Sequence, residues 1–398
     1  MQTDSRPLIA HVVHRFDTGG LENGVVNLIN HLPADRYRHA VVALTEVTDF
    51  SRRIERPDVT FAALHKPLGQ GFWMFARMRS VLRRLRPAIV HTRNLAALEM
   101  SAPAAWSGVP IRVHGEHGWD ERDPRGGSRI PPLVRRAYRP FVHRYVALSR
   151  QIRDYLVDRV GVDASDIALL YNGVDGQRFR PPQQGRENIP GSPFTDAETW
   201  LVGSVGRLSP VKDQLLLTRA FVRALELAPE SRRQLRLVVV GEGPLRGAIE
   251  GHLRESGVAQ LAWLAGDRGD IPLVMRGLDT FVLASLAEGI SNTILEAMAA
   301  ALPVIATRVG GNVELLDDGR TGTLVDSGDV EGLARAMLDG WRDRDAARAR
   351  GRRARAEVEC RFSLDRMVTG YAELYDGLLA QAVARGSLPR RYTLGMGS

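Results

Sequence analysis

Short apolar runs alternate with helical patterns along most of the chain. Each run leads into a polar or glycine turn and then into apolar residues at helical spacing, which predicts buried strands connected by helices. This alternation favours parallel sheets covered by helices. In the first half the predicted strands are Leu8–Val13, His39–Leu44, Ala88–Thr92, Ile111–Gly115 and Arg144–Ser149; in the second half they are Trp200–Gly206, Leu235–Gly241, Leu261–Gly266, Thr280–Ser285, Pro303–Thr307 and Gly322–Asp326.

A proline-rich break separates the two halves. Residues 176–196 contain four prolines without periodicity, so we interpret them as a linker or long loop. The α/β pattern then predicts two Rossmann-like domains, residues 1–175 and 197–363, with parallel sheets facing a central cleft. A last helix, about residues 364–385, has apolar residues at helical spacing and is predicted to pack back onto the first domain. Residues 386–398 are predicted to be a disordered tail.

The composition is that of a soluble globular protein. Of the 398 residues 44% are hydrophobic and 25% are charged, which are ordinary values. No apolar run approaches the roughly 18 residues of a membrane span, and the first residues do not form a signal-peptide pattern, so we expect a cytoplasmic protein. The single cysteine, Cys360, excludes an intramolecular disulfide and a cysteine-based metal cluster.

Basic charge is concentrated in the first half. Residues 1–175 hold 25 basic and 18 acidic residues, an excess of +7 out of the net +8. Two segments, 71–87 and 129–146, interleave aromatic residues with arginines. They are surface helices whose aromatics face the core, or they make peripheral contact with anionic lipid on the inner face of the cytoplasmic membrane. The pattern favours the first interpretation. We expect no nucleic acid partner, because no motif accompanies the charge.

Two glycine turns resemble phosphate-binding motifs but do not match them. Residues 241–247 have the spacing G-x-G-x-x-x-G, whereas a dinucleotide fingerprint is G-x-G-x-x-G. Residues 206–213 place a lysine after a glycine but have no second glycine and no Ser or Thr after the lysine. The sequence therefore disfavours a nicotinamide-dependent dehydrogenase and a P-loop enzyme.

The segment Ser285–Met298 carries two glutamates eight positions apart. Glu288 follows a predicted strand, and Glu296 is predicted in the first turn of the next helix, capped by Ser291 or Asn292. Backbone amides at a helix start attract anions, and open α/β sheets bind ligands at this end of their strands. A capped surface helix is the plainer alternative, and a glycosidase pair would need both carboxylates on one bond. We infer a diphosphate held by amides and hydroxyl groups held by each glutamate, as a nucleotide sugar requires.

Several motifs together resemble the family 4 retaining glycosyltransferases, which have the GT-B fold. The resemblance extends from about Leu8 to Leu379, and the first domain looks most like sugar transferases of bacterial exopolysaccharide clusters. The segments that carry it are 14–28, 88–99, 113–120, 169–175, 203–213, 238–246, 288–298 and 301–325.

The resemblance implies retaining transfer from a nucleotide diphosphate sugar, with a UDP-sugar favoured, to a glycan or lipid-linked acceptor. It implies no cofactor and no essential metal. The alternative is a catalytically silent nucleotide-sugar-binding regulator or subunit. The alternative of a catalytically silent protein is disfavoured by the joint presence of Arg207, Lys212, Glu288 and Glu296.

The resemblance also assigns roles to residues of the predicted second domain. Arg207 and Lys212 would grip the diphosphate, Glu288 would bind donor-sugar hydroxyls, and Glu296 would bind the ribose. Backbone amides would hold the distal phosphate and sugar. The residues that provide them are Gly289, Ile290, Ser291 and Asn292.

In the first domain the implied contacts are fewer. Gly19 and Gly20 would allow close approach of the backbone to the donor phosphate. His117 is the preferred catalytic-site histidine, whereas His114 is more readily a hydrogen-bonded strand residue. Weaker candidates are His91 and Arg93 at the acceptor and Gly241 beside the donor.

Overall fold

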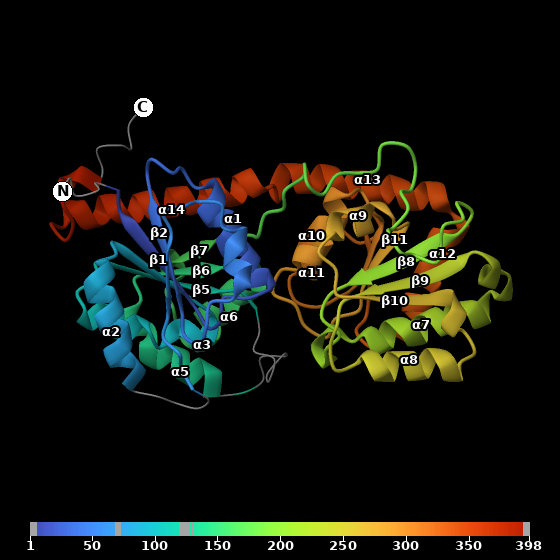
Figure 1. Cartoon of the computed structure of the whole chain (residues 1–398), viewed down its shortest axis with the longest axis horizontal. Coiled ribbons are helices and arrows are strands. Elements are labelled where there is room, and N and C mark those ends of the chain that lie inside the picture. Colours follow the sequence, from blue (N-terminus) through green and yellow to red (C-terminus); the bar gives the residue numbers. More distant parts are fainter. Residues whose placement is uncertain (1–5, 68–72, 119–127, 129, 393–398) are drawn as a thin grey trace. The chain divides into compact units, whose positions relative to one another are not determined.

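The computed structural model describes residues 6–67, 73–118, 128 and 130–392 (Figure 1). It divides into two compact units: the first ends at Asn172 and includes the residues from Asp365 onward, and the second holds Gly173–Leu364. Each unit is a parallel sheet covered by helices. This confirms the predicted α/β class with two Rossmann-like domains.

The first domain contains a seven-stranded sheet of order β3-β2-β1-β4-β5-β6-β7, in which every pairing is parallel. Its strands are β1 (Leu8–Val13), β2 (Arg38–Ala43), β3 (Thr60–Ala63), β4 (Ile89–Arg93), β5 (Ile111–Glu116), β6 (Arg144–Ala147) and β7 (Ile167–Leu169). Its α-helices are α1 (Gly20–His31), α2 (Trp73–Leu85), α3 (Asn94–Leu98), α4 (Ser101–Trp106), α5 (Ile130–Tyr138), α6 (Arg150–Tyr155) and α14 (Leu364–Ala384).

Both faces of this sheet are buried, which explains the continuous apolar runs in its strands. Val12 and Val42 pack with the buried residues of α2 on one face. Val13 and Val41 pack with the apolar side of α1 on the other. Since neighbouring residues of a strand point to opposite faces, a strand buried on both sides has little room for polar positions.

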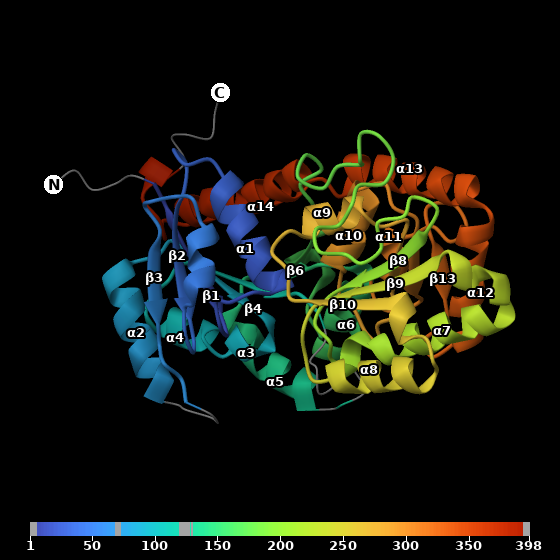
Figure 2. The same cartoon turned by 45° about the vertical axis from the view of Figure 1, so that its right-hand side comes forward.

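Helix α14 belongs to the first domain and lies along its sheet (Figures 1 and 2). The hydroxyl of Tyr375 is 2.8 Å from Nδ1 of His91 in β4. The carboxylate of Asp376 accepts hydrogen bonds from Tyr37 and Arg36. Burial is the main reason that the pKa of Tyr37 and of Tyr375 is raised above its ordinary value. The helix is thus held by polar bonds within an apolar interface.

The second domain contains a six-stranded parallel sheet of order β10-β9-β8-β11-β12-β13. Its strands are β8 (Trp200–Val205), β9 (Leu235–Val240), β10 (Ala262–Gly266), β11 (Thr280–Leu283), β12 (Val304–Thr307) and β13 (Thr323–Val325). Its α-helices are α7 (Gln214–Leu227), α8 (Arg246–Glu255), α9 (Ile271–Arg276), α10 (Asn292–Ala299), α11 (Asn312–Leu315), α12 (Val330–Arg342) and α13 (Arg344–Arg361).

The predicted linker or long loop 176–196 contains no helix or strand and packs within the second domain. Arg186 pairs with Asp279 at 3.3 Å, and Arg276 pairs with Glu187 at 2.8 Å. Ile189 is buried. Prolines interrupt the periodicity of a segment without preventing it from packing, so the sequence did not distinguish a linker from an ordered extended segment.

The end of the chain is only partly described. Residues 386–398 were predicted to be disordered, yet Arg390–Tyr392 form a short 3-10 turn. Residues 393–398 lie outside the described part. Within that part, no helix has both the length and the apolar character needed to cross a membrane.

The two basic segments follow the favoured interpretation of aromatics facing the core only in part: Phe75 packs against the core and Tyr145 is buried, but Trp73 and the apolar side chains of α5 are exposed. In α2 the buried side chains are methionines and a leucine, whereas Trp73 is 46% exposed. Helix α5 is inverted: Arg135 is buried while Ile130 and Leu133 are 71% and 60% exposed. The reason is Glu116, which is buried at the end of β5 and accepts from Arg135 Nε at 2.5 Å and Nη2 at 2.9 Å. A buried carboxylate requires such a partner.

Candidate active site

The two loops that carry the predicted donor-site residues lie side by side because of the strand order of the second sheet. Strand β8 pairs with β9 on one side and β11 on the other, so the chain direction across the sheet reverses between β8 and β11. Ligands bind open α/β sheets at this kind of switch point, beyond the carboxyl ends of the strands. The loop after β8 contains Arg207 and Lys212, and the loop after β11 contains Glu288.

Lys212 and Glu288 form an ion pair across these loops. Lys212 Nζ is 2.5 Å from Glu288 Oε1, and Ser285 Oγ donates to the same oxygen at 2.6 Å. Glu288 is 8% exposed. The amide of Leu286 donates to the carbonyl of Val211 at 2.8 Å and ties the two backbones together. One oxygen of a buried carboxylate therefore contacts both the lysine ammonium and the serine hydroxyl.

The turn after Glu288 leads directly into α10. Ser291 is the N-cap and accepts a hydrogen bond from the amide of Ile294 at 3.3 Å. The amides of Gly289 and Ile290 make no hydrogen bond within the described part of the chain. Because α10 begins at Asn292, Glu296 lies in its second turn, not in the first turn as predicted. The arrangement leaves two backbone donors beside the Lys212–Glu288 pair.

Two glycines after β12 pack closely against the backbone of this turn. Gly310 has φ +51°, and a Cβ added to it would lie 1.8 Å from the carbonyl oxygen of Glu288. A Cβ on Gly311 would lie 2.0 Å from the carbonyl oxygen of Gly289. Only glycine fits at such a distance. Both glycines lie in segment 301–325, which carries the family resemblance, and no role was predicted for them; a glycine pair shortly after a strand was the available signal.

Arg207 and Gly241 occupy neighbouring loops. Arg207 is exposed, and its carbonyl accepts from Gln214 Nε2 at 2.8 Å. Gly241 has φ +131°, and a Cβ added to it would lie 2.1 Å from the carbonyl oxygen of Gly206. The structure thus gives Gly241 a packing role: its missing side chain allows the β9 loop to approach the β8 loop that presents Arg207.

In the first domain, His114 and His117 differ in their surroundings. His114 lies within β5, with Nδ1 2.8 Å from Thr92 Oγ1 and Nε2 3.1 Å from Glu116 Oε1. His117 follows β5, and its amide donates to Asn94 Oδ1 at 2.7 Å. The ring of His117 packs over Gly115, and its Nε2 is buried without a hydrogen-bond partner in the described part of the chain.

Burial and Arg93 determine the charge of several first-domain histidines. Burial, followed by the positive charge of Arg93, holds the pKa of His11 and of His117 well below the ordinary value. For His91 the same two causes act in the same order. For His39, burial and then Arg56 lower the pKa to about 3. These four imidazoles are therefore neutral at neutral pH.

His91 and Arg93 do not have the exposure that contact with an acceptor requires. His91 is fully buried and bonded to Tyr375, and Arg93 is 1% exposed with Nη1 3.2 Å from Nδ1 of His11. The prediction that both residues line an acceptor site is wrong for this structure. The cause is α14, which covers this face of β4 and could not be placed there from the residues near position 91.

Gly19 and Gly20 form the start of α1. Gly19 is the N-cap in an extended conformation, and Gly20 is the first helical residue. A Cβ on Gly19 would lie 2.2 Å from the carboxylate of Glu22. In this structure the small residue therefore makes room for the side chain of Glu22.

A possible metal motif has a structural explanation. Asp343, Arg344 and Asp345 form an Asp-x-Asp triplet. Asp343 caps α13 by accepting from the amide of Ala346 at 3.0 Å, and the side chain of Asp345 is 99% exposed. The triplet is a helix start, which favours acidic residues without any metal.

Comparison with known families decides the class of this protein. The model of the family described as Glycosyltransferase Family 4 matches residues 18–178, and the model described as Glycosyl transferases group 1 matches residues 200–343. The chain is a family 4 glycosyltransferase. The first matched region covers the first domain from α1 to β7, the second covers all strands of the second sheet, and the domain pair is the GT-B fold of this family.

Relatives of this glycosyltransferase are named for different sugars, among them galactose and mannose. It is 29% identical over 269 residues to the Escherichia coli UDP-Gal:alpha-D-GlcNAc-diphosphoundecaprenol alpha-1,3-galactosyltransferase, covering 65% of this chain and 67% of that one. It is 25% identical over 321 residues to glycosyltransferase EpsF of Bacillus subtilis, covering 76% and 79%. Further relatives are matched over only 48% to 60% of their own length.

A solved structure supports the fold. The glycosyltransferase superimposes on Anabaena Alr3699/HepE in complex with UDP-glucose with a TM-score of 0.78, covering 94% of this chain and 100% of that one. The sequence identity is 21%. At this identity the likeness shows the shared two-domain architecture.

Proposed function

We propose that this glycosyltransferase transfers a sugar, with retention of its anomeric configuration, from a nucleoside diphosphate sugar to a glycan or lipid-linked acceptor. The observation that carries the proposal is the Lys212–Glu288 pair beside the amides of Gly289 and Ile290, at the switch point of the second sheet. A cation and backbone donors suit a diphosphate, and a buried carboxylate suits hydroxyl groups.

The diphosphate is bound by Arg207, Lys212 and the start of α10. In the absence of a ligand the ammonium of Lys212 is compensated by Glu288. When a diphosphate enters, its oxygens compete for the same ammonium, and Arg207 adds a second positive group. Leaving-group charge that develops as the glycosidic bond breaks is then stabilised by groups already in position.

The donor sugar is oriented by Glu288. Its second oxygen, Oε2, has no hydrogen bond in the described residues, so it is available to accept from sugar hydroxyls. Ser285 holds the carboxylate in this orientation through Oε1. Glu296, on the second turn of α10, accepts from the ribose hydroxyls. The two carboxylates thus bind opposite ends of one ligand, which explains their spacing.

Retention follows if the departing diphosphate deprotonates the acceptor hydroxyl on the face from which it leaves. No protein carboxylate then needs to attack the sugar, and no metal needs to bridge the phosphates. His117 and the turn at Gly19 and Gly20 are our proposed contacts from the first domain. The favoured donor is a UDP-sugar, in line with a relative named for UDP-Gal and a structural neighbour solved with UDP-glucose.

The acceptor belongs, in this proposal, to bacterial exopolysaccharide or cell-surface polysaccharide synthesis, with the protein in the cytoplasm. One relative is named for a diphosphoundecaprenol-linked acceptor and another is EpsF. Exposed apolar side chains in the basic first domain fit peripheral contact with an anionic membrane. They are Trp73, Trp106, Ile130, Leu133 and Val134.

The proposal is tested by thermal melting with UDP-, GDP- and ADP-sugars, each with a chelator present. Binding to the native state raises the midpoint by mass action. We expect one nucleotide class to raise it with the chelator present and Lys212→Ala to abolish the rise. Transfer of the bound sugar with retention is then followed by the anomeric proton signals of the product. Inversion, or a shift that requires a divalent metal, would contradict the proposal.

A further inference from the structure

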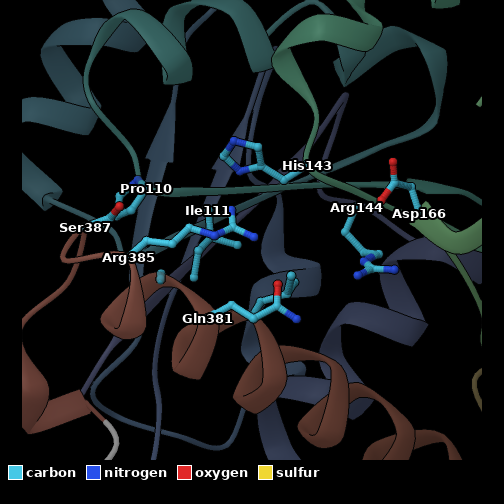
Figure 3. A pocket seen from close by; sticks show the side chains of 10 residues that line it. Pro110, Ile111, His143, Arg144, Asp166, Gln381, Arg385 and Ser387 are labelled. Carbon is cyan, nitrogen blue, oxygen red and sulfur yellow. The ribbon is translucent and has the colours of Figure 1, made fainter. Parts of the chain in front are cut away.

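A pocket in the first domain lies at the amino edge of its sheet, at the opposite end of β5 from Glu116. It has a volume of about 240 Å³ and is formed by the amino ends of β5 and β6, the turn before β7 and the end of α14. Figure 3 shows Gln381 on α14 and Arg385 just after its end on one side of Ile111 and His143, with Arg144 and Asp166 at the other side.

The positive groups in and behind this pocket have only neutral partners. Arg144 donates to the carbonyl of Ser165. Arg385 makes no side-chain hydrogen bond or ion pair in the described part of the chain. Behind His143, Arg112 donates to the carbonyls of Phe141 and Val109, both at 2.7 Å, and its Nη2 is 2.7 Å from His143 Nε2.

One guanidinium nitrogen of a pocket-lining arginine is a buried donor without an acceptor in the described part of the chain. Arg144 Nε is buried and has no partner within the described residues. The only carboxylate among the lining residues is that of Asp166. Two guanidinium groups, Arg144 and Arg385, therefore line the pocket with one carboxylate, and Arg112 adds positive charge behind His143. This excess of positive charge favours an anion.

His143 reports the same positive field. Burial, then Arg112, then Arg385 lower its pKa to about 4. The imidazole is consequently neutral at pH 7 and adds no charge of its own. An anion beside Arg385 would cancel part of this field, so it would raise the pKa of His143.

We propose that this pocket binds a phosphate ester of a polyhydroxylated compound, the chemical class of a sugar phosphate. The guanidinium groups of Arg144 and Arg385 bind the phosphate, and hydroxyl groups of the ligand donate to Asp166 and to the amide oxygen of Gln381. The bound anion links the end of α14 to the amino ends of β5 and β6. It therefore stabilises the packing of α14 on the first sheet.

The site is independent of the proposed transfer reaction, because none of its residues belongs to the donor-binding set. His143 is also a local reporter: phosphate bound at Arg207 and Lys212 in the other domain does not alter the charges that Arg112 and Arg385 place beside it. Failure of the anion site and failure of the proposed function can thus be told apart.

The test is an NMR titration of the His143 ring against pH, with glucose 1-phosphate or inorganic phosphate added and with chloride at equal ionic strength as the reference. We expect the phosphates, but not chloride, to raise the pKa of His143. In Arg385→Ala the phosphate concentration needed for half of this pKa shift should rise about tenfold or more, as expected for loss of a charge-assisted bond. Arg83→Ala, which removes the same charge from exposed α2, should leave it unchanged.

A phosphate monoester can also be a lipid headgroup, so a second arm uses vesicles that contain phosphatidate. An Arg385-dependent response to glucose 1-phosphate identifies a soluble ligand, and a response confined to vesicles identifies a headgroup; both support a phosphate-ester site. No response to either would overturn it. An equal loss in Arg83→Ala would also overturn it, since general screening would then explain the effect.

Discussion

Nζ of Lys212 lies 2.5 Å from Oε1 of Glu288, so the cation predicted to hold a diphosphate is already paired with the carboxylate predicted to hold the sugar. Ser285 shares that oxygen at 2.6 Å. The charge of Lys212 is therefore neutralised by Glu288 without a ligand. A bound donor must take the place of the Glu288 carboxylate at Lys212, or of the ammonium at Glu288. The first two predictions below follow from this geometry.

Glu288→Gln separates nucleotide binding from transfer. The amide keeps the shape of the side chain but no longer competes as an anion for Lys212. We expect UDP to bind equally well or up to about tenfold more tightly, while transfer falls at least about 100-fold. Calorimetric titration and a transfer assay measure the two effects. Lys212→Ala is the counterpart and should weaken UDP binding about tenfold or more; weaker UDP binding in Glu288→Gln would refute competition for the ammonium.

Ser285→Ala tests whether the Ser285 hydroxyl positions the carboxylate of Glu288. The hydroxyl donates to the ionised Glu288 and touches neither nucleotide nor sugar in our proposal. A hydrogen bond to a charged group contributes about 1.5–3 kcal/mol, so kcat should fall roughly tenfold or more. Dissociation of UDP should change less than about threefold. A parallel loss of UDP binding and kcat would show that Ser285 supports the whole loop and has no specific effect on Glu288.

Gly310→Ala tests the close approach of the β12 loop to Glu288. Its Cβ would lie 1.8 Å from the carbonyl oxygen of Glu288. Gly319→Ala is the matched control, because Gly319 also has positive φ (+77° against +51°) but has nothing within 4 Å of the added Cβ. We expect Gly310→Ala to lower the free energy of unfolding by about 2 kcal/mol or more beyond the control. Chemical denaturation of both variants measures this, and equal losses would mean that the clash relaxes freely.

Stability should fall as the pH drops below about 6.5. His11, His39, His91 and His117 have lowered pKa values in the fold, with His39 at about 3. Below the ordinary pKa the unfolded chain binds protons that the folded chain does not, so unfolding becomes more favourable as pH decreases toward the folded pKa values. Each such histidine adds up to about 1.4 kcal/mol per pH unit.

Urea unfolding between pH 7.5 and 5.5 measures this slope. His39→Gln should reduce it, because that residue no longer takes up a proton on unfolding. His65→Gln, which replaces an exposed histidine of the same domain, is the control. A free energy of unfolding independent of pH over this range would contradict the buried neutral state of these residues.

The proposed membrane contact should depend on the outward apolar face of α5. Replacing Ile130 and Leu133 by serine removes side chains that are 71% and 60% exposed, so the fold should be unaffected. Partition onto anionic vesicles should weaken about tenfold or more, in proportion to the apolar area no longer buried. Val313→Ser, at an exposed apolar position of the second domain, is the control. Unchanged partition in the double variant would remove α5 from the contact.

The sequence alone determined the order of strands and helices apart from the short strands β3 and β7, the two-domain α/β class and the segments that carry the donor-site residues. These features are local: a buried strand, its following turn and a helix cap are all encoded within a few neighbouring residues. Glu288 beyond β11 is one example, and the cap of α10, predicted at Ser291 or Asn292 and found at Ser291, is another.

Tertiary structure alone decided which side chains meet. Lys212 and Glu288 are 76 positions apart, and His91 and Tyr375 are 284 apart. Their contacts depend on the order of strands across a sheet and on which face α14 covers, and neither is encoded near those residues. The inversion of α5 has the same origin, because a helix face is buried or exposed according to its neighbours, and a buried Glu116 draws Arg135 inward.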